Sequence, residues 1–390
     1  MVAMDATAIE PIARAMVDIS ASIRAGDTAL VFYDAGGALL ARRVARLASE
    51  KGARVLYIQR DQALEAEVAA TCSDRDALRS SAINDFAIQM ADAVFMIRCA
   101  SDADAFASVP RDRMVLWNRA REPYLMNYRV NHTRWILIYW PTEKEAAVEG
   151  LSHPEYVDLF LNACNQPWKE IADAQDHLIS ALNAGTTLEI QANPRDPDPR
   201  RRTHVTMDIG PMSFVNSIID RNFPGSEVFS SPVRDSVSGQ VFAAGLYAYD
   251  GHTMEDIYLR IESGRIVEAD ARVGQENLIA VLDTDEGSRY FGEIAFGTNP
   301  GLRRRVMNGL LNEKVGGSFH ITPGRAYSFT DYEGQPVRVD NGNRSQIHWD
   351  IAIPMLPDYG GGSVRVDGND IQIDGRFVDP KLAVLNAGLE

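Results

Sequence analysis

Residues 28–58 read TALVFYDAGGALLARRVARLASEKGARVLYI and decide the fold of the first half of the chain. Thr28–Tyr33 and Arg54–Ile58 are apolar runs with the length of buried strands, and Ala38–Ser49 between them has apolar residues at helical spacing. A strand, a helix and a second strand in this order predict a βαβ unit with parallel strands. The glycines of the first strand-to-helix turn belong to no GxGxxG or P-loop motif, so no nucleotide site is expected.

The same alternation continues over residues 1–192, which we expect to form an α/β domain with a mainly parallel sheet. Helical patterns cover Ala8–Arg24 and Pro154–Asn183. Three more apolar runs are expected as strands, and these are Ala93–Ile97, Met114–Trp117 and Trp135–Tyr139.

The second half has a different pattern. A connector rich in proline and charge, Ala192–Arg202, is followed by many short strands with tight turns. Examples are Asp256–Ile261 and Arg265–Asp270, which flank the turn Ser263-Gly264. We therefore expect residues 193–390 to form an α+β domain that is rich in antiparallel strands and carries the functional site.

The composition narrows the class of function. The 390 residues are 45% apolar and 24% charged, as in ordinary soluble proteins, and the formal charge is −15. Nucleic acids and anionic lipid repel such an acidic chain, so neither is expected as a partner. The charge is compatible with a cation site, although solubility alone is the commoner reason for it.

We expect the protein in the cytoplasm. Cys72, Cys99 and Cys164 are too few and too widely spaced for a disulfide framework, which fits a reducing compartment. The first twenty residues contain acidic side chains where a signal peptide has basic and apolar regions. No uncharged apolar run reaches the length of about 18 residues that a membrane helix needs.

Two histidines stand out because of their neighbours. In the run from Ile347 to Ile351, strand alternation would point His348 and Asp350 to one face, where both can bind one divalent cation. His320 lies in a second alternating run, SFHIT. Taken alone, a His-x-Asp pair is more often a simple hydrogen-bonded pair than a metal site.

Two glutamates lie among apolar residues. Glu227 and Glu293 are flanked by aromatic and aliphatic side chains, where a buried carboxylate is costly unless it is paired or bound to a metal. Taken alone, each fits a solvent-exposed edge of a sheet. Together with the two histidines and Asp350, they form a donor set that suits two divalent cations about 3.5–4 Å apart.

Four stretches resemble the aminopeptidase T / aminopeptidase S family of dinuclear metallo-aminopeptidases, also called the thermophilic aminopeptidase family. They read FPGSEVFSSP, RYFGEIAFG, NEKVGGSFHITPGRAY and NRSQIHWDIAI, from residues 223, 289, 312 and 343 onward. The resemblance extends over most of the chain and is greatest in the second half. It implies that the metal ligands are Glu227, Glu293, His320, His348 and Asp350, and that Tyr327 is an active-site tyrosine.

The resemblance also implies a mechanism and partners. Two divalent ions (Zn, Co or Mn) would activate a shared water to hydrolyse the N-terminal residue from a peptide. Tyr327 would donate to the oxyanion, and Glu227 or Glu313 would carry the proton to the leaving amine. Asn312 stands where the family commonly has an aspartate, which sets Glu313 apart from the five implied ligands. A homodimer is expected from the resemblance alone.

A more distant resemblance provides the alternative function. The enzyme 2,5-dihydroxypyridine 5,6-dioxygenase is a non-haem iron(II) ring-cleaving enzyme with two histidines and one carboxylate around one Fe(II). It has a histidine at the position of Glu293 and lacks the His320 ligand, whereas this chain has both residues of the two-metal set. A non-catalytic protein would lack at least one donor, and all five are present.

Overall fold

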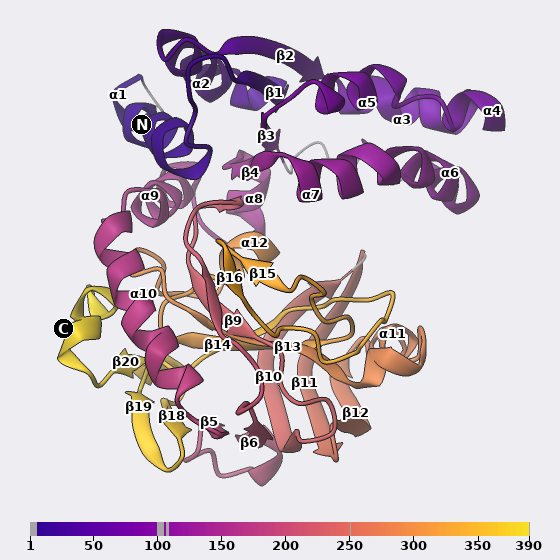
Figure 1. Ribbon diagram of the computed structural model, residues 1–390. Helices are drawn as coiled ribbons and strands as arrows, with labels where there is room; N and C mark the ends of the chain where they lie inside the picture. Colours follow the sequence, from indigo (N-terminus) through magenta and orange to yellow (C-terminus); the bar gives the residue numbers. More distant parts are fainter. Residues whose placement is uncertain (1–5, 100–104, 107–108, 250, 390) are drawn as a thin grey trace. The chain divides into compact units, whose positions relative to one another are not determined.

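The βαβ pattern of the first half folds into a parallel sheet in the order β2-β1-β3-β4-β8 (Figure 1). The strands are β1 (Thr28–Asp34), β2 (Arg54–Arg60), β3 (Ala93–Cys99), β4 (Arg134–Trp140) and β8 (Asn222–Phe223). The helices are α1 (Ala6–Arg14), α2 (Ala38–Glu50), α3 (Gln62–Thr71), α4 (Asp74–Ala77), α5 (Ala82–Gln89), α6 (Arg111–Arg121), α7 (Arg129–His132), α8 (Glu143–Val148) and α9 (His153–Cys164). These elements confirm the predicted α/β class.

The computed structural model describes residues 6–99, 105–106, 109–249 and 251–389. The chain divides into two compact units, residues 1–165 with 219–224, and residues 166–218 with 225–390. Helix α10 (Trp168–Asn183) belongs to the second unit. The domain boundary after residue 192 stays a prediction.

Three sequence predictions for the first 192 residues are wrong in detail. Met114–Trp117 lies in helix α6 and not in a strand, because an apolar run of four residues has no period that distinguishes the two. The helix predicted for Pro154–Asn183 is two helices, α9 and α10, and the break includes Pro167, whose ring cannot continue a helix. The first helix continues from α1 only as a π-helical turn that ends at Ser20.

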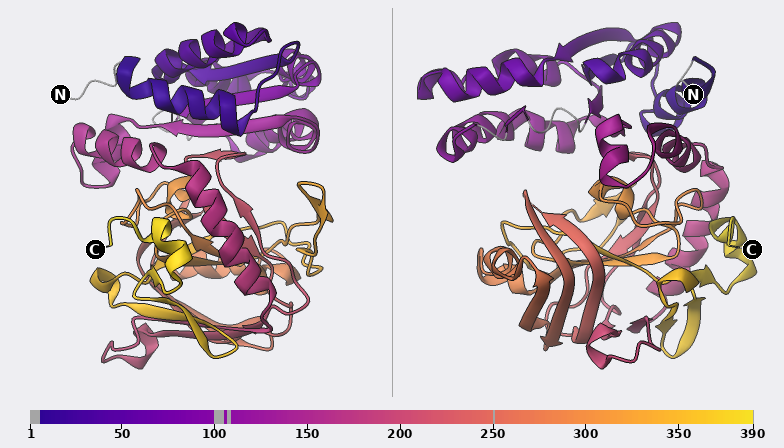
Figure 2. Two further views of the ribbon diagram at one scale, coloured as in Figure 1. Left: turned by 60° about the vertical axis from the view of Figure 1, so that its left-hand side comes forward. Right: turned by 180° about the vertical axis from the view of Figure 1, so that it is seen from behind.

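The second unit contains two antiparallel sheets. One has the order β12-β11-β10-β6-β5-β18-β19-β20, and the other has the order β17-β14-β13-β9-β7. Figure 2 shows β10, β11 and β12 as long neighbouring strands, with α11 beside β12. The strands of the larger sheet are β5 (Thr187–Ala192), β6 (Thr203–Asp208), β10 (Ser238–Tyr249), β11 (His252–Glu262), β12 (Arg265–Val273), β18 (Gly362–Val366), β19 (Asn369–Ile373) and β20 (Arg376–Phe377).

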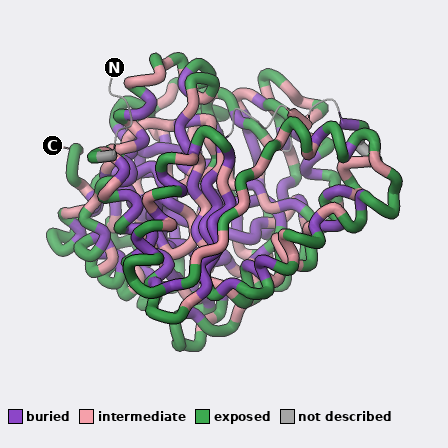
Figure 3. The backbone as a smooth tube through the Cα atoms, turned by 90° about the horizontal axis from the view of Figure 1, so that it is seen from above, coloured by how far each residue is buried: buried purple, intermediate pink, exposed green. Residues whose placement is uncertain are grey.

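The smaller sheet is almost completely buried. Its strands are β7 (Val215–Ser217), β9 (Glu227–Ser230), β13 (Phe291–Gly297), β14 (Ser318–Pro323) and β17 (Ile351–Pro354). Every residue of β13 and β14 is buried, and Figure 3 shows that exposed residues gather instead on connecting loops and the outer faces of helices. Short helices α11 (Gln275–Leu282) and α12 (Gly309–Asn312) and the hairpin β15–β16 (Asp331–Pro336) complete the unit. The predicted α+β class is confirmed.

The helices give no sign of a membrane span. Among the described residues, none of them combines the length and the apolar character that crossing a bilayer requires.

Replacing Phe95 by alanine tests the order of the parallel sheet. Phe95 is fully buried in the inner strand β3, so Phe95→Ala should lower the free energy of unfolding by about 3–5 kcal/mol, measured by urea denaturation. The matched control is Tyr57→Ala, because Tyr57 is 71% exposed on the edge strand β2. Its change should stay within about 0.5 kcal/mol. Equal losses in the two variants would contradict this strand order.

Candidate metal centre

One face of the smaller sheet carries three of the predicted donors. Glu293 of β13 lies opposite Thr322 of β14, and two residues further along β13 Ala295 lies opposite His320. Gly297 of the same strand lies opposite Glu227 of β9. Because alternate residues of a strand point to the same side, Glu227, Glu293 and His320 share one face.

The first donor group is formed by these three side chains. His320 Nε2 lies 3.7 Å from Glu227 Oε2 and 3.5 Å from Glu293 Oε1. All three residues are buried. One donor atom from each lies within 4.8 Å of the others, so the group can hold a metal ion.

The second donor group shares Glu293 with the first. His348 Nε2 lies 3.1 Å from Glu293 Oε2 and 3.6 Å from Asp350 Oδ1. His348 Nδ1 lies 2.7 Å from the Arg325 carbonyl oxygen, to which it donates, so that Nε2 is free to face the carboxylates. His348 and Asp350 precede β17 and do not lie within a regular strand, yet their side chains meet as the sequence predicted.

The spacing of these atoms fits a bound cation. Ligand bonds of about 2.0–2.2 Å in a tetrahedral arrangement separate neighbouring donors by about 3.3 Å. The four nitrogen–oxygen distances of 3.1–3.7 Å lie around this value. In addition, Glu227 Oε2 is buried and has no hydrogen-bond partner among the described residues. Carboxylates and imidazoles are suitable donors for divalent Zn, Co and Mn.

The electrostatics of the cluster also favour a cation. Burial lowers the pKa of His320, but the hydrogen bond to Glu293 and the charges of the neighbouring carboxylates outweigh it and raise that pKa to about 9. The same balance raises the pKa of His348 to about 10. Burial raises the pKa of Glu293, yet its hydrogen bonds to both histidines hold that pKa well below its usual range. The carboxylates therefore attract positive charge, which a metal ion can supply in place of protons.

Glu313 and Tyr327 lie beside the donor groups and belong to neither. Burial raises the pKa of Glu313 to about 8 against the opposing charge of Lys314. The ring centroid of Tyr327 lies 5.6 Å from that of His348. Burial, together with the surrounding carboxylates, raises the pKa of Tyr327 well above its usual range, so its hydroxyl stays protonated and can donate a hydrogen bond.

Two polar neighbours of the donors were not predicted. Thr322 Oγ1 lies 2.6 Å from Asp350 Oδ1, to which it donates. Lys314 Nζ lies 2.5 Å from Glu227 Oε1 and 2.9 Å from Glu313 Oε2. Lys314 directly follows Glu313, but nothing in the sequence pattern shows that a lysine is buried there.

The sequence matches a known family over most of its length. The matching family model is the thermophilic metalloprotease (M29) model, over residues 5–357. The chain belongs to the thermophilic metalloprotease (M29) family. This membership confirms the resemblance found in the sequence, makes the chain a metallopeptidase, and implies a divalent metal.

Individual relatives of this M29 chain agree with the family match. Aminopeptidase 2 of Geobacillus stearothermophilus is 25% identical over 403 aligned residues, which cover 92% of this chain and 93% of that protein. The structure of AmpT from Thermus thermophilus matches with a TM-score of 0.73 at 21% identity, over 96% of this chain and 99% of that one. A 2,5-dihydroxypyridine dioxygenase from Pseudomonas putida KT2440 has the same fold, with a TM-score of 0.58 at 15% identity over 96% and 98% of the two chains.

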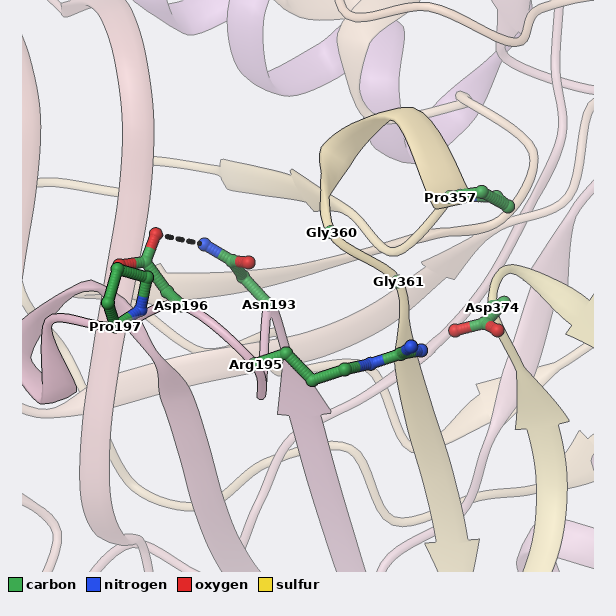
Figure 4. Close-up of a pocket in the computed structure, with 8 residues that line it drawn as sticks. All are labelled: Asn193, Arg195, Asp196, Pro197, Pro357, Gly360, Gly361 and Asp374. Carbon is green, nitrogen blue, oxygen red and sulfur yellow. Dashed lines mark hydrogen bonds between the residues drawn. The ribbon is translucent and has the colours of Figure 1, made fainter.

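A separate hollow of about 490 Å³ lies elsewhere in the second unit of the M29 chain (Figure 4). In it, Asn193 Nδ2 donates to Asp196 Oδ2 at 2.9 Å, and the side chain of Arg195 extends toward Asp374. Its lining residues are Asn193, Arg195, Asp196, Pro197, Pro357, Gly360, Gly361 and Asp374. None of them is a predicted site residue, so the carboxylate–histidine cluster is the candidate site.

Glu293→Gln tests whether one carboxylate serves both donor groups. The substitution keeps the size of the side chain but removes the charge that both groups share. Replacing a residue that only hydrogen-bonds to a metal ligand lowers metal affinity by about 10- to 100-fold. Glu293 is itself a predicted ligand, so Glu293→Gln should lower the Co²⁺ affinity by more than this, measured by Co²⁺ titration of the metal-free protein. Glu276→Gln, an exposed site on α11, is the control and should bind Co²⁺ as the parent does. Parent-like affinity in Glu293→Gln would remove Glu293 from the site.

Proposed function

We propose that this chain is a metal-dependent aminopeptidase that hydrolyses the N-terminal residue from peptides, with two divalent cations (Zn, Co or Mn) in the cluster. The observation that carries the proposal is the position of Glu293, whose two oxygens face two different histidines. Glu227 and His320 would complete one metal site, and His348 and Asp350 the other. Membership of the M29 family and the similarity to a protein named Aminopeptidase 2 support this function.

The bound ions would lower the pKa of a water molecule and polarise the scissile carbonyl group. The protein's own groups have separate tasks around them. Tyr327, protonated and next to His348, would donate a hydrogen bond to the oxygen that gains negative charge. Glu313, a carboxylate that belongs to neither donor group, would accept a proton and return it to the leaving amine.

The donor groups fit action at a free amino terminus. The amine of a free amino terminus has a lone pair that it would donate to a bound cation, whereas the nitrogen of an internal or acylated peptide bond has its lone pair delocalised into the carbonyl group. Peptides with an acetylated amino terminus should therefore be poor substrates.

An iron(II) dioxygenase is a weaker interpretation. Each donor group has one histidine and two carboxylates, whereas a facial triad for non-haem iron has two histidines and one carboxylate. The similarity of fold to a dioxygenase does not offset this difference, because one fold can support unrelated reactions. The homodimer and the cytoplasmic location stay predictions.

Removal of metal gives the most direct test of the function. Dialysis against a chelator should abolish the release of the N-terminal residue from a dipeptide, and Zn²⁺, Co²⁺ or Mn²⁺ should restore it, because the water is activated by the ions. Product release is measured by chromatography, and metal content by elemental analysis, for which we expect two ions per chain. Activity that survives complete removal of metal would refute the proposal. Oxygen consumption with Fe²⁺ and a dihydroxypyridine, without peptide hydrolysis, would favour the dioxygenase.

Tyr327→Phe tests the proposed oxyanion donor. The variant keeps the ring and loses only the hydroxyl, so kcat should fall by about 10²–10³-fold, as for other oxyanion donors, while the metal content stays unchanged. Steady-state kinetics on a dipeptide measure the effect. Tyr33→Phe, in the first unit, is the control and should retain full activity. A parent-like kcat in Tyr327→Phe would show that the hydroxyl takes no part in the reaction.

A further inference from the structure

Lys314 is a fully buried lysine whose ammonium lies between two carboxylates of the candidate centre. Nζ lies 2.5 Å from Glu227 Oε1 and 2.9 Å from Glu313 Oε2. An ammonium group has three hydrogens and no lone pair, so it can donate to both carboxylates at once but cannot bind a metal. Burying a charged lysine is costly unless it is paired, which makes this contact more than an incidental surface ion pair.

The backbone is shaped to bring Lys314 to this position. A Cβ atom on Gly297 of β13 would lie 2.2 Å from the Val315 carbonyl oxygen and 2.9 Å from that of Glu313. Residues 313–315 therefore cross the face of the sheet at the point where β13 has no side chain. The Lys314 carbonyl oxygen then accepts from the Asn299 backbone N–H at 3.0 Å, which fixes the crossing segment. Gly297 is also the residue opposite Glu227, so the crossing places the ammonium next to that carboxylate.

Contact with Lys314 leaves Glu227 with one available oxygen. Oε1 is held by the ammonium, whereas Oε2 is buried, has no hydrogen-bond partner among the described residues, and faces His320 Nε2. Glu293 differs, because each of its oxygens faces a histidine. If metal ions bind here, Glu227 would hold one of them through a single oxygen, and Glu293 would offer one oxygen to each donor group.

We propose that Lys314 is a positioning residue that restricts Glu227 to a single ligand oxygen and holds Glu313 beside the metal centre without letting it become a ligand. Without the ammonium, Glu227 can turn both oxygens to one cation, and the freed Glu313 can approach it as well. Either movement adds a ligand to a site whose open position the reaction needs. This inference rests on the proposed function, because it assigns the roles of groups within the same centre.

Lys314→Met is the principal test, because methionine keeps most of the volume and removes the charge. The Co²⁺-loaded variant should show a weaker visible absorption band at shorter wavelength, as expected when the number of ligands rises. Its kcat should fall by about 10- to 100-fold while KM stays close to the parent value. A parent-like Co²⁺ spectrum and kcat would overturn the proposal, because a lysine with a purely structural role would change only the stability of the fold. Lys169→Met, at an exposed position on α10, is the matched control and should change none of these quantities.

If Lys314→Met does not fold, a measurement on the parent protein tests the positioning role of Lys314. The chain has only five lysines, so ¹⁵N-lysine labelling gives a simple spectrum of ammonium groups. A buried ammonium held by two carboxylates exchanges slowly with water, and we expect one such signal that shifts when Zn²⁺ is added and persists in the metal-loaded protein. Loss of that signal on metal binding would mean that Lys314 releases Glu227, which overturns the proposal.

The two proposals fail in different ways. If the parent protein shows no metal-dependent peptide hydrolysis, the proposed function fails, while the Co²⁺ spectrum and the ammonium signal still report on Lys314. If the parent protein is an active metallopeptidase and Lys314→Met keeps its spectrum and kcat, only the positioning role fails.

Discussion

The second unit is organised around negative charge that is brought together on one side of a buried sheet. Glu227 and Glu293 are buried, and Asp350 and Glu313 lie beside them at the same cluster. Like charges at such distances repel one another, and the low dielectric of the interior strengthens the repulsion. The Lys314 ammonium offsets part of this repulsion. Another part is offset by the two histidines, whose pKa is raised so that each holds a proton more firmly. A histidine that binds a metal must lose the proton from its ligating nitrogen. The charge of a bound cation would then replace the charge of those protons in offsetting the carboxylates.

Small residues make this arrangement sterically possible. Gly297 leaves room for residues 313–315 to cross the sheet, as described for Lys314. Gly292 has a similar task at the other end of β13, where a Cβ atom would lie 2.2 Å from the Arg325 carbonyl oxygen. That carbonyl accepts the hydrogen bond from His348 Nδ1, so the close approach at Gly292 helps to orient a predicted ligand. Strand β13 thus supplies a central carboxylate and, through its two glycines, the space for the segments that surround it.

The sequence predicted the class of each half and the residues of the cluster, but not the contacts between them. Strand alternation would place His348 and Asp350 on one side of the chain, yet it says nothing of which strands pair, and the pairing of β13 with both β9 and β14 is what brings Glu227 to His320. The resemblance to a family supplied that information. The residues alone were equally compatible with Glu227 and Glu293 at solvent-exposed edges of a sheet. Lys314 was missed because lysine is rarely buried, and only the three-dimensional crossing at Gly297 shows that it is. The role of the five donors as ligands stays a prediction.

The fold by itself does not choose between hydrolysis and oxygenation, because a peptidase and a dioxygenase both share it. The choice depends on a few donor atoms. With a histidine in place of Glu293, the group that includes His348 and Asp350 would have the two histidines and one carboxylate that suit one iron. With Glu293, the same group has an additional negative charge, and a second oxygen reaches toward His320. In the proposed function, that second oxygen would hold another cation next to the first, so a single carboxylate would convert a site for one metal into a site for two.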